Sequence, residues 1–143
     1  MRDVKNTLLN HHGFVDNEYL DLYCRLVERN GRTPIRHRVT NSHHIIPKSW
    51  FKLNKQTVDN SQSNLVNLVY REHVLAHYYL CLCTVDELQF ANELALMCLL
   101  NRKKLNVVDK QLVTGLPLYN NIYEHYKQRR RDNYQLYKEE EEE

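Results

Sequence analysis

Four of the eight histidines lie close together in the sequence as two pairs, His43 with His44 and His73 with His77. A spacing of four residues places His73 and His77 on one face of a helix, near enough to share one metal ion. Three neutral imidazoles can hold a divalent ion and leave positions open for water and substrate. A fourth imidazole can act as a general base, because its ordinary pKa is about 6.5. These residues therefore predict metal-assisted hydrolysis, and basic surroundings would suit a phosphodiester.

The doublet His43–His44 can serve a single site only where its strand ends, bulges or turns. Adjacent side chains of a regular strand point to opposite faces, and Pro47 makes such an ending reasonable. Each pair taken alone also fits a bland interpretation, such as helix-surface histidines or one buried and one exposed histidine. The two pairs together, on a strand–loop–strand–helix unit of about 35 residues, are much more specific.

Three segments around these histidines resemble the HNH nuclease motif. They are residues 41–48 (Asn-Ser-His-His-Ile-Ile-Pro-Lys), 63–68 (Ser-Asn-Leu-Val-Asn-Leu) and 71–77 (Arg-Glu-His-Val-Leu-Ala-His). The sequence is similar to phage and bacterial HNH endonucleases, including free-standing homing types, strongly over 41–80 and more weakly over 84–137. The resemblance implies the ββα-metal fold, in which a hairpin packs on a helix that carries metal ligands.

The resemblance also implies a role for each motif residue. His44 matches the general base that deprotonates the attacking water. Asn64 matches the central asparagine, which braces the hairpin backbone and so holds the base in place. Asn67 is a competing candidate, although the nine-residue interval to His73 favours Asn64. The implied metal ligands are His43, His73 and His77.

The expected cofactor is one divalent metal ion. Three imidazoles suit Zn²⁺, Ni²⁺ or Mn²⁺ better than Mg²⁺, which prefers oxygen ligands, and the ion that supports turnover stays open. One segment departs from the family pattern. Relatives often have a short glycine-containing loop after the Pro-Lys-Ser step, whereas residues 50–58 contain no glycine. Trp50 and Phe51 in that segment either pack into the core or contact DNA.

Periodicity and turn signals predict the elements that must position these residues. The apolar spacing after Asp16 or Asn17 indicates a helix that ends near Arg29. The sequence Thr-Val-Asp-Glu at 84–87 is a capping box, which would open another helix. The full set of predicted elements is a helix at 16–29, strands at 36–46 and 64–70, a polar loop at 49–63, and helices at 71–83, 84–100 and from about 117 past 131.

These elements predict an α+β fold, mostly helical, with a ββα-metal hairpin-plus-helix core and flanking helices. Residues 1–15 carry weak signals and are expected to form an N-terminal arm. A single HNH nuclease domain is expected over 16–138, with its ββα-metal core at about 36–83 and C-terminal helices at 84–138. Residues 139–143 are an acidic tail.

The chain has 20 Lys and Arg against 18 Asp and Glu, but the last five residues are all glutamate. A basic body with an acidic tail is one way to present a surface for a polyanion. The tail is either a solvated extension or a competitor for that surface, and the basic residues are either phosphate contacts or solvated charges. The candidate DNA contacts are Arg36, Arg38, Lys48, Arg71, Arg129, Arg130 and Arg131.

No apolar run approaches the roughly 18–20 residues of a membrane span, and the first residues lack an apolar signal core. The sequence therefore predicts a cytoplasmic protein with no membrane partner, and the resemblance to HNH endonucleases implies a bacterium or a phage-infected host cell. The four cysteines lack a CxxC spacing and are expected to be free, buried thiols.

The expected function is that of a metal-dependent DNA endonuclease of homing, restriction or phage DNA-processing type. Its partner would be double-stranded DNA, and a homodimer could read a palindrome and cut both strands. Two alternatives stay open: a non-catalytic nucleic-acid-binding protein with a structural zinc site, and a metal-dependent RNase.

Overall fold

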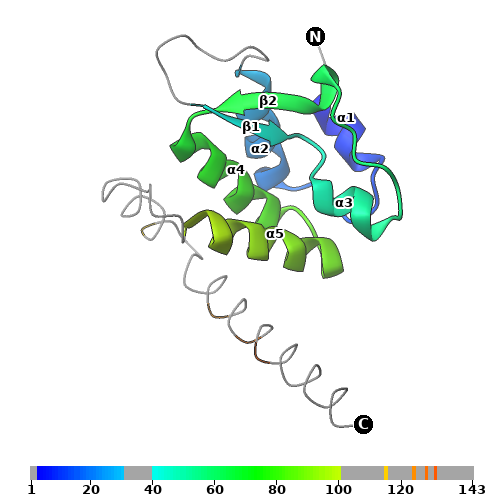
Figure 1. Ribbon diagram of the computed structural model, residues 1–143, viewed down its shortest axis with the longest axis vertical. Coiled ribbons are helices and arrows are strands. Elements are labelled where there is room, and N and C mark those ends of the chain that lie inside the picture. Colours follow the sequence, from blue (N-terminus) through cyan, green and yellow to red (C-terminus); the bar gives the residue numbers. More distant parts are fainter. Residues whose placement is uncertain are drawn as a thin grey trace.

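A computed structural model of the protein describes residues 3–30 and 40–100, together with Gly115, Glu124, Gln128 and Arg131. Within these residues the fold is a mostly helical α+β arrangement, with five helices and a two-stranded antiparallel hairpin packed against helix α4 (Figure 1). This confirms the predicted fold class at that level. The elements are α1 (Val4–Leu9), α2 (Glu18–Glu28), β1 (Asn41–His44), α3 (Lys48–Leu53), the 3-10 turn η1 (Gln62–Asn64), β2 (Leu65–Leu68), α4 (Tyr70–Leu82) and α5 (Asp86–Leu100).

Several predicted features lie outside the described residues. These are the beginning of the first strand, most of the helix expected after residue 117, and the acidic tail. Of the candidate DNA contacts, Arg36, Arg38, Arg129 and Arg130 also lie outside, whereas Arg131 is described as helical and exposed.

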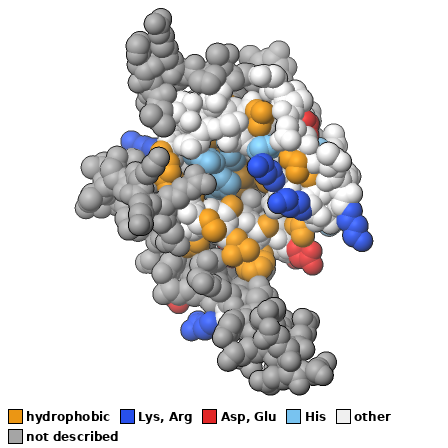
Figure 2. All heavy atoms as spheres, in the orientation of Figure 1, with side chains coloured by type: hydrophobic (Ala, Val, Ile, Leu, Met, Phe, Trp, Pro, Cys, Tyr) orange, Lys and Arg blue, Asp and Glu red, His pale blue; other side chains and the backbone are white. Residues whose placement is uncertain are grey.

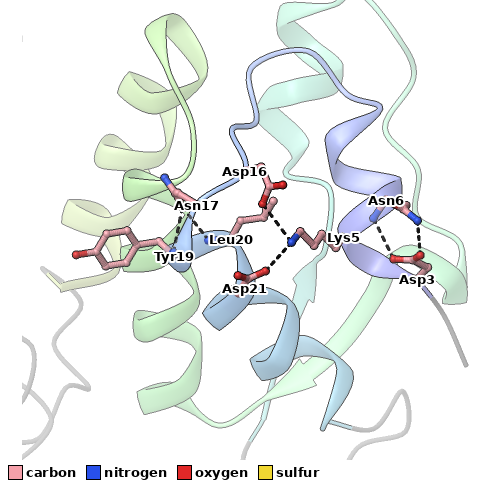
Figure 3. Close-up of polar contacts among 8 residues, drawn as sticks. All are labelled: Asp3, Lys5, Asn6, Asp16, Asn17, Tyr19, Leu20 and Asp21. Atoms are coloured by element: carbon pink, nitrogen blue, oxygen red, sulfur yellow. Dashed lines mark hydrogen bonds and ion pairs between the residues drawn. The ribbon is translucent and has the colours of Figure 1, made fainter.

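Helix α2 begins and ends close to where its apolar spacing predicts. The Asn17 side chain caps it by accepting from the backbone N–H groups of Tyr19 and Leu20 at 3.0 and 3.1 Å (Figure 3). The apolar face of the helix, including Leu20 and Tyr23, is fully buried and packs against α4. An amphipathic helix with a side-chain cap thus holds one side of the hairpin-and-helix unit.

The N-terminal residues belong to the folded core, contrary to the expectation of an arm. Val4 and Leu8 lie four residues apart on α1 and are both buried. Lys5 pairs with Asp16 and Asp21 at 3.1 and 3.0 Å, which joins α1 to the start of α2 (Figure 3). A six-residue helix has little stability of its own, so burial of its apolar stripe is what holds it.

The register of the hairpin decides which histidine faces inward. His43 lies opposite Val66, and both are buried, whereas His44 lies opposite Leu65, and both are partly exposed. Paired residues share a face of a sheet and successive residues alternate. The second strand is shorter than predicted, because Asn64 lies in η1 and Tyr70 already belongs to α4.

The segment predicted as a polar loop contains helix α3. Its Trp50 and Phe51 are buried in the core, so the alternative in which they face DNA is wrong. The indole Nε1–H of Trp50 donates to the backbone oxygen of His12 at 2.9 Å. Burial of two large aromatic side chains stabilises a turn of helix that local propensity does not indicate.

Helices α4 and α5 pack against each other through a second apolar cluster that includes Leu96 and Met97. The four cysteines are free, as predicted, but Cys98 is exposed whereas the other three are buried. The predicted capping box does not form, since α5 begins at Asp86 and the hydroxyl of Thr84 donates to the backbone oxygen of Leu80. In the described part of the chain, none of the helices has the length and apolarity that a membrane crossing needs.

Candidate metal centre

Helix α4 brings two of the predicted metal ligands together. The ring nitrogens Nε2 of His73 and His77 lie 3.1 Å apart. His73 is buried and His77 is partly buried, because the same face of α4 packs toward the hairpin. The spacing of four residues therefore produces the convergence that the sequence predicts.

His43 completes a cluster of three imidazoles. Its ring centroid lies 5.2 Å from that of His73 and 5.1 Å from that of His77. One ring nitrogen from each of the three residues lies within 4.8 Å of the others. We call His43, His73 and His77 the histidine cluster. The sequence named all three as ligands, and the hairpin and helix bring them to one place.

The geometry of the histidine cluster fits a divalent ion such as Zn²⁺. Zinc–nitrogen bonds of about 2.0–2.1 Å in a tetrahedral site put two ligand nitrogens about 3.3 Å apart. The separation of 3.1 Å between His73 and His77 is close to that value. Ligand atoms as far apart as 4.8 Å would approach by about 1.5 Å to reach it. The site could therefore hold one metal ion.

Burial keeps the imidazole of His43 neutral, which is the protonation state that binds a metal ion. Burial, and the nearby rings of His77 and His73, lower the pKa of His43 well below its ordinary value of 6.5. A neutral imidazole has one nitrogen with a free lone pair, which is the form that binds metals. His43 is thus available as a ligand at neutral pH without losing a proton.

Tyr23 touches the histidine cluster from α2, and sequence reasoning did not find it. Its hydroxyl lies 2.8 Å from Nε2 of His43 and donates to the backbone oxygen of Ile45 at 2.7 Å. Tyr23 is fully buried, which raises the pKa of its phenol well above 10.0 and keeps it protonated. The available signal was a tyrosine on the buried face of an amphipathic helix, because a buried hydroxyl needs a polar partner.

His44 lies beside the histidine cluster but is not part of it. Its Nε2 is 2.7 Å from the side-chain oxygen of Asn60, in the loop before η1. An amide oxygen can only accept, so Nε2–H of His44 is the donor and Nδ1 carries the lone pair. His44 is partly exposed, so this lone pair belongs to a ring that solvent can reach.

Asn64 connects the two sides of the loop that follows β1. Its side-chain oxygen accepts from the backbone N–H of Ile46 at 2.8 Å. Its side-chain nitrogen donates to the backbone oxygens of Ile46 and Asp59 at 3.3 and 3.0 Å. Asn64 is 3% exposed, so these bonds form in a dry environment. They fix the backbone immediately after the two histidines.

A groove of about 410 Å³ gives access to the histidine cluster and to His44. One wall is α3, which contributes Lys48 and Lys52, and another is α5, which contributes the small residues Ala91 and Ala95. No acidic side chain lines the groove among the described residues. Figure 2 shows the histidine side chains gathered in the middle of one face, with basic side chains next to them. The groove is therefore suited to an anion.

Three of the candidate DNA contacts lie in the described part of the chain, each in different surroundings. Lys48 lines the groove, at the start of α3. Arg71 is exposed on α4 but does not line the groove. Arg131 is exposed, and its guanidinium donates to Gln128 at 3.0 Å. Lys52 also lines the groove. It follows Lys48 by four residues, so both side chains lie on one face of α3.

In comparisons with known proteins, the chain matches no family model, no curated protein and no solved structure.

Proposed function

We propose that the protein is a metal-dependent DNA endonuclease of HNH type that hydrolyses phosphodiester bonds. The observation that carries the proposal is the histidine cluster in a groove that a fourth histidine, His44, also lines. Lysines line the same groove, and among the residues that the structure describes no acidic side chain does. Metal ligands, a free base and an anion-compatible surface are the parts that phosphodiester hydrolysis needs.

His44 is the proposed general base. The Nε2–H of His44 donates to the side-chain oxygen of Asn60, so the lone pair on Nδ1 is available to take a proton from water. Asn64 keeps the loop after β1 in place and so limits the movement of the His44 ring. A base that is oriented by a second group is the usual arrangement in hydrolytic sites.

His43, His73 and His77 would hold the metal ion, which when bound would stabilise negative charge on the scissile phosphate. Lys48 and Lys52 are proposed to contact flanking phosphates along the groove. Charge of this kind positions the substrate but carries no sequence information. The target sequence would have to be read by other parts of the chain or by a second copy.

The main alternative is a structural zinc site. Burial of His43 and His73 favours it, because structural sites are closed. The groove that reaches the histidine cluster argues against it, as does a histidine beside the ligands whose ring is held by Asn60. A site with only a structural role needs neither feature.

The test is nicking of supercoiled plasmid with Mg²⁺, Mn²⁺, Ni²⁺ or Zn²⁺ by the wild type, His44→Ala and His12→Ala. His12 is an exposed histidine outside the groove and controls for loss of an imidazole. We expect His44→Ala to bind metal with unchanged affinity in calorimetry and to lose cleavage by a factor of about 10² or more. His12→Ala should behave as the wild type does.

Equal cleavage by His44→Ala would remove His44 as the base. Tight zinc binding without cleavage of plasmid, single-stranded DNA or RNA would replace the proposal with the structural zinc site. Cleavage of RNA alone would keep the chemistry and change the substrate.

A further inference from the structure

Tyr23 lies outside the motif segments, and its side chain hydrogen-bonds to His43 of the histidine cluster. It comes from α2, twenty residues before His43 in the sequence. Its ring meets that of His43 edge to face, with centroids 5.9 Å apart. A phenylalanine would fill the same space, so the hydroxyl needs a separate explanation.

The two hydrogen bonds of Tyr23 leave only one consistent placement of the protons. The backbone oxygen of Ile45 has no proton to give, so at 2.7 Å it must accept the single proton of the Tyr23 hydroxyl. The contact of 2.8 Å to His43 then requires that Nε2 of His43 carries a proton and donates it to the tyrosine oxygen. A neutral imidazole has one N–H, so the lone pair of His43 lies on Nδ1.

We propose that Tyr23 is a positioning residue that fixes His43 in the Nε2–H tautomer and thereby makes Nδ1 its metal-binding atom. A histidine that binds a metal through one ring nitrogen commonly donates the N–H of its other ring nitrogen to an oxygen, which orients the ring. Here that oxygen is a tyrosine hydroxyl that is itself held by the backbone after β1. The inference rests on the metal site of the proposed function, but not on DNA cleavage.

The same hydroxyl links the ligand to the neighbouring base. Ile45 follows His44 directly, and its N–H donates to the backbone oxygen of Asn64 at 2.9 Å. The Tyr23 hydroxyl therefore contacts the ring of His43. It also contacts the backbone oxygen of Ile45, the residue after His44. Both connections come from a fully buried side chain on a capped helix, which has little freedom to move.

The direct test is the tautomer of His43 in the wild-type protein. Long-range ¹H–¹⁵N spectra of protein labelled in histidine distinguish Nε2–H from Nδ1–H, and His43→Ala identifies the His43 signals. We expect the Nε2–H form without metal, and a Zn²⁺-induced shift at Nδ1 with Nε2 still protonated. An Nδ1–H form, or zinc on Nε2, would overturn the proposal.

The second test is Tyr23→Phe, with Tyr19→Phe as a matched control on the same helix. We expect Tyr23→Phe to weaken Zn²⁺ affinity in calorimetry by about 10–100-fold and to lower the Nε2–H fraction of His43. Tyr19, which is only partly buried, should change neither quantity. A purely structural tyrosine would alter the unfolding midpoint and leave the tautomer unchanged, and that result would refute the proposed role.

The wild-type spectra decide the question even if Tyr23→Phe does not fold. They also separate this inference from the proposed function. If zinc binds through Nδ1 of His43 but the protein cuts no nucleic acid, the proposed nuclease function is refuted. The proposed role of Tyr23 is then still supported.

Discussion

Replacement of Asn64 by alanine should destabilise the fold strongly, although Asn64 lies in a short turn. The substitution removes three side-chain hydrogen bonds and leaves the buried N–H of Ile46 without its acceptor at 2.8 Å. Each lost hydrogen bond is worth about 0.5–1.5 kcal/mol, and an unsatisfied buried donor costs about 1–3 kcal/mol. Because these contributions overlap, we expect a loss of about 2–4 kcal/mol in the free energy of unfolding.

The assay is urea denaturation of metal-free protein. Trp50 is the single tryptophan in the chain and is buried, so its fluorescence reports unfolding of the loop between the strands. A thermal scan should show a midpoint lowered by roughly 6–20 °C, since 1 kcal/mol corresponds to about 3–5 °C for a chain of this length, between the values for smaller and larger domains. Asn67→Ala is the matched control, because Asn67 is the competing asparagine and is only partly buried on β2. We expect it to cost less than about 1 kcal/mol.

Asn64→Asp separates the two halves of the interaction. Aspartate keeps an acceptor for the N–H of Ile46 but cannot donate to the backbone oxygens of Ile46 and Asp59 when ionised. We expect it to lose at least about 1 kcal/mol. If Asn64→Ala costs no more than Asn67→Ala, the hydrogen bonds of Asn64 do not hold the hairpin and the reasoning is refuted.

Three further predictions concern the groove and the core. Zn²⁺ at 100 times its Kd should stabilise the wild type by about 2.7 kcal/mol, and His77→Ala should abolish this shift in a thermal scan; a mutant stabilised as much as the wild type would exclude His77 as a ligand. Lys48→Glu combined with Lys52→Glu should weaken binding to duplex DNA and reduce the slope of log affinity against log salt by about 1.8, and an unchanged slope in fluorescence anisotropy would show that neither lysine contacts a phosphate. Trp50→Ala should cost about 3–5 kcal/mol, measured by circular dichroism because the fluorophore is lost, and a cost below about 1 kcal/mol would contradict its place in the core.

The sequence by itself determined the features that depend on local geometry. The four-residue interval between His73 and His77 brings their rings together on any regular helix, whatever that helix packs against. The cap at Asn17 and the apolar face of α2 follow in the same way from side-chain chemistry and period. The pairing of two strand-forming segments before α4 was predictable because their residue types and order are those of a hairpin.

Only the tertiary structure decided which residues meet across long sequence separations. Residues that local signals left ambiguous, such as Val4 on α1 and Trp50 on α3, are helical because burial against distant elements outweighs weak local propensity. The register of β1 against β2, together with α4 below it, turns His43 inward and leaves His44 at the groove. Tyr23 reaches His43 only because α2 packs on α4, and no spacing in the sequence records the partner of a buried hydroxyl.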